Sequence, residues 1–224
     1  MPVVLPVGHF DAAPTDRAAV APVTAAFAAL CVAVFVGVQA QGHDVEWTWA
    51  LGAVPAEVLS AEDGTARGVL SLATSLVAHA SWAHLFYNLV ALWVFGAAVE
   101  RSLGAARTFA LYLGVGVAAT LVEAAVSAAP TVPIVGASGV VAAAAGAFAV
   151  GYPRSRVVVA ALFLTVPVPA WVALGLWAAV ELMAGGGGEG IAHAAHLSGF
   201  ALGALAMRVA RIGVSGSNAA EPHV

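Results

Sequence analysis

The chain has 224 residues, of which 62% are hydrophobic and only 9% are charged, and its formal net charge is −4. Soluble globular domains carry about 25% charged residues, so a chain of this composition needs lipid as its solvent. The basic residues are all arginine and form no run, which argues against a nucleic-acid partner. The single cysteine, Cys31, excludes an intramolecular disulfide and a multi-cysteine metal site.

Apolar segments recur along the chain at lengths that suit a bilayer, since a transmembrane helix needs about 20 mostly apolar residues. A long polar stretch from residue 42 to residue 74 separates the first segment from the second and carries interfacial tryptophans. Short polar turns, prolines and a glycine run separate the others. The predicted spans are Val20–Gln41, Trp82–Val99, Thr108–Ala128, Ser138–Val150, Ala170–Ala184 and Ile191–Ile212.

The segment between the fourth and fifth spans is ambiguous. Its apolar run Val157–Val166 is either a separate helix or a connector that dips into the interface. Pro167 and Pro169 favour a break before the fifth span. Glycine-rich residues 185–190 then form a predicted flexible cap over the candidate site described below, and we expect this cap and the fifth helix to act as its gate.

Arginine placement tests the count of spans. With six spans and the N-terminus inside, seven of the eight arginines fall on the cytoplasmic side and only Arg67 falls outside, as the positive-inside rule expects. The sequence therefore predicts a multi-pass plasma-membrane protein with both termini in the cytoplasm. Residues 1–19 and 213–224 are predicted as cytoplasmic tails around one membrane domain, residues 20–212.

Four polar residues fall where lipid would make them costly, which marks them as functional candidates. His84 and Asn88 are four residues apart and share one face of the second span. Ser138 opens the fourth span and His196 lies about five residues into the sixth. All three spans run inward in the predicted topology, so the four side chains converge in the outer half of the membrane.

This convergence suits acyl-transfer chemistry. Ser138, flanked by Gly136, Ala137 and a further glycine, is an accessible hydroxyl that needs a base, and His196 can supply one. The oxyanion needs preorganised donors. The candidates are the side chains of His84 and Asn88, the backbone N–H groups of Gly136 and Ala137, and the free N–H groups at the start of the fourth span. No acid is evident at matching depth to orient His196, so the prediction is a Ser–His dyad. The pair Gly199 and Gly203 is interpreted as a close-packing face of the sixth helix.

These residues carry a family resemblance. The stretch from His79 through His84 and Asn88 to Glu100 resembles the second helix of rhomboid intramembrane proteases. Gly-Ala-Ser-Gly at 136–139 is similar to their G-x-S-G nucleophile motif, and residues 195–203 are similar to their A-H-x-x-G-x-x-x-G sixth helix. Many members also carry a Trp-Arg pair in the first outer loop. Here Arg67 stands without that tryptophan.

The resemblance implies an all-α bundle of six transmembrane helices with a long outer loop between helices 1 and 2. It implies that Ser138 is the nucleophile, His196 the general base, and His84 and Asn88 the oxyanion side chains. It further implies a serine endopeptidase without metal or cofactor, embedded in the lipid bilayer. Its partners would be single-span transmembrane protein substrates, cleaved near the outer membrane face.

Other interpretations stay open at this point. A catalytically silent rhomboid-like protein would bind client helices without cutting them, and a small transporter would need internal repeats that the chain lacks. His193 and His196 could be a metal pair, but no third ligand has helical spacing near them, so no metal site is expected. Glu181, inside the fifth span, is predicted to bond loop backbone or a neighbouring helix.

Overall fold

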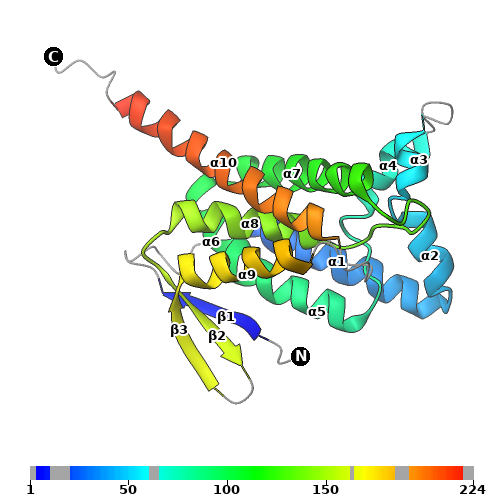
Figure 1. Cartoon of the computed structure of the whole chain (residues 1–224), viewed down its shortest axis with the longest axis horizontal. Helices are drawn as coiled ribbons and strands as arrows, with labels where there is room; N and C mark the ends of the chain where they lie inside the picture. The colour runs from blue at the N-terminus through cyan, green and yellow to red at the C-terminus, as the bar shows by residue number, and fades with distance from the viewer. Residues whose placement is uncertain (1–3, 11–20, 61–65, 162–163, 185–191, 219–224) are drawn as a thin grey trace.

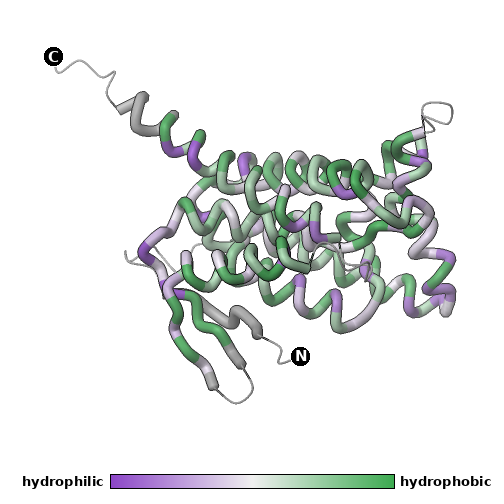
Figure 2. Tube along the Cα trace, in the orientation of Figure 1, coloured by the Kyte–Doolittle hydropathy of each residue, from purple (hydrophilic) through white to green (hydrophobic). Residues whose placement is uncertain are grey.

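The computed structural model describes residues 4–10, 21–60, 66–161, 164–184 and 192–218. Most of them form helices that pack side by side into one bundle (Figure 1). Hydrophobic residues predominate along these helices, as Figure 2 shows. The helices are α1 (Pro22–Gln41), α2 (Asp44–Leu51), α3 (Pro55–Leu59), α4 (Ala66–Thr74), α5 (Trp82–Ala91), α6 (Ala97–Leu103), α7 (Ala105–Val126), α8 (Ser138–Gly151), α9 (Ala170–Ala184) and α10 (His193–Asn218), with a π-helical turn η1 (Leu92–Gly96) between α5 and α6.

Helix α8 is the centre of the bundle. Most of its residues are buried, and it packs most extensively on α10 and then on α7. Its sequence is largely alanine and glycine, whose small side chains let neighbouring backbones approach closely.

Helices α8 and α10 touch backbone to backbone. A Cβ at Gly199 would lie 2.6 Å from the Gly139 carbonyl oxygen, and one at Gly203 would collide with the Ala143 carbonyl. Since both pairs are separated by the same 60 positions (199 − 139 and 203 − 143), the two helices run parallel in a fixed register. A larger residue at either glycine would push the helices apart.

The first turn of α1 is held by a buried carboxylate from α6. Glu100 accepts hydrogen bonds from the Val23 and Thr24 N–H groups at 2.9 and 2.8 Å, and from Thr24 Oγ1 at 2.7 Å. Thr24 Oγ1 also pairs with the Tyr112 hydroxyl of α7 at 2.9 Å. Because α1 has no side-chain cap of its own, Glu100 satisfies two otherwise unpaired N–H donors. Its negative charge also interacts favourably with the positive end of the α1 dipole.

The predicted outer loop between the first two spans is structured. Helices α2, α3 and α4 fill it, and residues 61–65 lie outside the described part of the chain. Arg67 joins all three helices, because its guanidinium pairs with Glu57 Oε1 at 3.1 Å and donates to the Trp49 carbonyl at 2.9 Å. Arg67 thus anchors this region through a carboxylate of α3 and a backbone carbonyl of α2.

The expectation of an all-α chain is wrong at one place. Strands β1 (Val4–Phe10), β2 (Arg156–Ala161) and β3 (Leu164–Pro169) form an antiparallel sheet in that order, away from α2–α4 in Figure 1. The ambiguous run after the fourth span is therefore a β-hairpin and not a separate helix, while its position relative to the membrane interface stays a prediction. Consecutive β-branched residues favour strands, and Pro167 is tolerated because β3 is an edge strand.

The number of membrane spans is only partly established. Among the described helices, three are long and apolar enough to cross a membrane: Pro22–Gln41, Trp82–Leu103 and Ala105–Val126. Helices α8 and α9 are apolar but shorter. The count of six spans and the cytoplasmic placement of both termini stay predictions. Most of the tail residues and the predicted glycine-rich cap at 185–190 lie outside the described residues.

Candidate active site

Ser138 is the first residue of α8, at the end of a tightly held turn. Gly136, two residues earlier, has φ +124° and donates its N–H to the Ser75 carbonyl at 2.9 Å. A Cβ at this glycine would lie 2.6 Å from the His84 ring, so both the backbone conformation and the close approach require glycine. No side chain of the described residues caps the start of α8, which leaves its first-turn N–H groups without a side-chain acceptor.

His79 forms a hydrogen bond with the backbone of the same turn. Its Nδ1 lies 3.2 Å from the Val77 carbonyl, and its Nε2 accepts a long hydrogen bond, 3.5 Å, from the Ala137 N–H. Both contacts fit one neutral tautomer with the hydrogen on Nδ1. Burial, and to a smaller degree the neighbouring His84, lowers the pKa of His79 to about 4. His79 is therefore a backbone anchor of the Ser138 turn.

The two backbone donors predicted for an oxyanion hole are engaged within the protein. Gly136 N–H binds Ser75 and Ala137 N–H binds His79. The Asn88 amide also donates one hydrogen to the His84 carbonyl at 2.9 Å, which leaves its second amide hydrogen available. The His84 ring, packed edge-on against His79 with centroids 5.1 Å apart, lies over the Gly136 turn next to Ser138.

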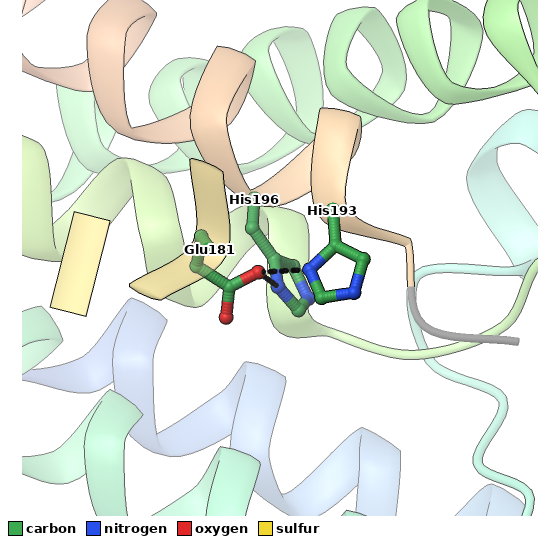
Figure 3. A group of neighbouring side chains, drawn as sticks. All are labelled: Glu181, His193 and His196. Carbon is green, nitrogen blue, oxygen red and sulfur yellow. Dashed lines mark hydrogen bonds and ion pairs between the residues drawn. The ribbon is translucent and has the colours of Figure 1, made fainter. Parts of the chain in front are cut away.

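His196 lies in the first turn of α10 and is oriented by a carboxylate. Its Nδ1 is 2.9 Å from Glu181 Oε2, on α9, and His193 Nδ1 is 2.7 Å from the same oxygen (Figure 3). Trp177 packs beside the His196 ring with centroids 6.2 Å apart. An imidazole that donates from Nδ1 keeps its Nε2 lone pair, which is the form that a general base needs.

The structure gathers the predicted residues at one end of the bundle. The His84 ring lies against Gly136, and Gly199, less than one turn after His196, touches Gly139, the residue after Ser138. Between the described residues Ser138 and His196 there is no direct hydrogen bond. Apo sites often have such bonds long or unformed, and they tighten when substrate binds.

Glu181 corrects the expectation that no acid lies where it could orient His196, since its carboxylate is 2.9 Å from His196 Nδ1. A carboxylate within an apolar helix is costly and is a signal in itself, and its partner was predicted as loop backbone or a neighbouring helix. The structure pairs it with two histidines of the next helix. It also removes the reason given against a metal, because the third ligand comes from α9 and not from helical spacing within α10.

Comparison with known proteins identifies the family of the chain. The model of the rhomboid domain matches residues 66–212, about two thirds of the chain. The chain belongs to the rhomboid family. The matched range contains all the candidate residues from His79 to Gly203. With its apolar helices, this rhomboid-family chain is a membrane protein.

Two curated relatives resemble parts of the chain. Rhomboid protein 1, mitochondrial, from Saccharomyces cerevisiae is 32% identical over 145 residues, 61% of this chain and 40% of that protein. Rhomboid protease GluP from Bacillus subtilis is 38% identical over 76 residues, 34% of this chain and 14% of that protein. The chain thus spans less than half of the length of either relative.

Proposed function

We propose that the chain is an intramembrane serine endopeptidase in which Ser138 is the nucleophile and His196 the general base. The observation that carries the proposal is the fixed His196 ring: Glu181 binds Nδ1 and leaves Nε2 free, beside the helix that begins with Ser138. Membership of the rhomboid family and the resemblance to a rhomboid protease support the same chemistry.

In the proposed reaction, Ser138 Oγ attacks the scissile carbonyl while His196 Nε2 takes the hydroxyl proton. The imidazolium then gives that proton to the leaving amine, and a water molecule hydrolyses the acyl-enzyme by the reverse sequence. Developing positive charge on His196 is stabilised by the Glu181 carboxylate, which we assign as a positioning residue.

Negative charge on the tetrahedral oxygen needs donors that are not already committed. The free amide hydrogen of Asn88, the His84 ring and the uncapped first-turn N–H groups of α8 meet that condition. The Gly136 and Ala137 N–H groups, predicted for this role, would first have to leave Ser75 and His79. We therefore propose the side chains and the α8 terminus as the oxyanion hole.

We propose that the substrates are single-span transmembrane proteins, cleaved near the outer face of the plasma membrane. Wild type, Ser138→Ala and His196→Ala should be compared in proteoliposomes with a fluorogenic transmembrane substrate, and by labelling with a fluorophosphonate. Both variants should lose cleavage, and Ser138→Ala should lose the label, while a matched control, Ser127→Ala, keeps both.

The outcome also separates the proposed protease from a catalytically silent rhomboid-like binder. The silent binder would be favoured if wild type does not react with the fluorophosphonate and cleaves no member of a library of transmembrane helices, yet binds one of them. Full activity of a folded Ser138→Ala variant would refute the assigned nucleophile.

A further inference from the structure

The cluster formed by Glu181, His193 and His196 has a use beyond orienting a base. We propose that these three residues form a binding site for Zn²⁺, and that the bound ion switches the enzyme off by occupying the nitrogen through which His196 is oriented. The first half of the proposal stands on the cluster alone. The second half rests on the proposed function.

The ligand atoms already converge. His193 and His196, three residues apart on one face of α10, direct their Nδ1 atoms to the same carboxylate oxygen of α9, as Figure 3 shows. Ligand atoms of the three residues all lie within 4.8 Å of one another. Zinc held at about 2.0–2.2 Å in a tetrahedron keeps its ligand atoms about 3.3–3.6 Å apart. The two contacts to Glu181, 2.7 and 2.9 Å, need to open by only a fraction of an ångström.

The chemistry of the donors selects the ion. Two imidazole nitrogens and one carboxylate oxygen suit zinc, whereas magnesium and calcium prefer sites made of oxygen atoms. Three protein ligands leave a fourth position for water. The side chains are 13–15% exposed, so the cluster is not sealed inside the bundle. A second carboxylate, Glu123, accepts the Ala195 N–H at 3.0 Å between the two histidines and adds negative charge beside the site.

Zinc at Nδ1 and general-base catalysis exclude each other at His196. A neutral imidazole has one lone-pair nitrogen and one N–H. In the structure the hydrogen fits Nδ1, where Glu181 accepts it, and the Nε2 lone pair is free. When Nδ1 binds zinc, the hydrogen moves through solvent to Nε2, with no net change in protons. Nε2 can then donate but cannot take the proton of Ser138.

The binding test uses the full chain without a histidine tag, in detergent. Zinc is titrated against a chromophoric chelator, and Co²⁺ is added separately to read the ligand field from its visible spectrum. Wild type and Ser138→Ala should each bind one ion with the same affinity. His193→Gln and Glu181→Gln should bind at least about tenfold more weakly. His43→Ala, which removes an exposed histidine paired with Glu46 at 3.3 Å, should bind like wild type.

The activity test compares the cleavage rate of each variant in the presence of zinc with its cleavage rate in the presence of a chelator. Zinc should inhibit wild type and His43→Ala at the concentration that fills the site, and His193→Gln should need at least about tenfold more zinc. Binding in Ser138→Ala supports the site even if the proposed function fails. Absence of stoichiometric binding, or equal zinc affinity in His193→Gln and wild type, overturns the site. A filled site with unchanged cleavage overturns the inhibitory role.

Discussion

Replacing Glu181 with glutamine removes the charge beside His196 and keeps nearly the same shape. A hydrogen bond between neutral groups contributes about 0.5–1.5 kcal/mol net, and one to a charged group about 1.5–3 kcal/mol. The midpoints of these ranges differ by about 1.3 kcal/mol, which is close to tenfold in rate when it applies to the imidazolium of the transition state. The side chains are partly exposed, so solvent screening argues against a larger effect. We expect Glu181→Gln to lower kcat about tenfold.

The assay is the initial rate of cleavage of a fluorogenic transmembrane substrate in proteoliposomes, measured over a full range of substrate in a chelator. A positioning role predicts a lower kcat with KM unchanged, an unaltered melting temperature, and a Glu181→Asp variant more active than Glu181→Gln. The matched control is Glu46→Gln, which neutralises an exposed carboxylate paired with His43. A folded Glu181→Gln enzyme with kcat within twofold of wild type would refute the reasoning.

Three further predictions concern the scaffold. Gly203→Val should abolish cleavage by forcing α10 away from the Ala143 carbonyl, whereas Gly175→Ala, which meets no atom within 4 Å, should leave activity unchanged in the same assay. Glu100→Ala should lower the free energy of unfolding by about 3 kcal/mol, because it strands two N–H donors of α1; thermal melting in detergent measures it, and an unchanged melting temperature would contradict it. The pKa of His79 is lowered to about 4 in the folded protein, so the free energy of unfolding should decrease by about 3 kcal/mol in all as pH falls from about 6.5 to about 4. Melting temperatures measured across that range should depend less on pH in His79→Gln than in wild type. An equal pH dependence in the two proteins would rule the assignment out.

The sequence predicted the helices well where local chemistry marks their ends. The fifth predicted span coincides with α9, because prolines precede it and a glycine run follows it. The first residue of α8 was also correct, since Gly136 and its neighbours form a turn. The β-sheet was missed because a run of valines is apolar enough to be taken for a membrane segment, and periodicity does not distinguish a short buried strand from a helix.

The candidate site was predictable only in part, for a physical reason. Ser138 and His196 stand in motifs with fixed spacing, and the predicted direction of each span places them at one expected depth. Glu181 has no motif, and its contact with α10 depends on how two helices pack. His79 stands in the stretch that resembles the family's second helix, but its hydrogen bond to Ala137 joins residues 58 positions apart. Tertiary contacts of this kind are not encoded in any short pattern.

Three independent contacts restrict the geometry in which Ser138 and His196 could react. The close contact of Gly199 with the Gly139 carbonyl sets the register of α10 on α8. Glu181 sets the rotation and tautomer of the His196 ring, while Ser75 and His79 hold the backbone turn before Ser138. None of these contacts touches a reacting atom. Because a displacement of about 1 Å can cost about a hundredfold in rate, activity should fall when any one of them is broken, even with every proposed reacting side chain retained.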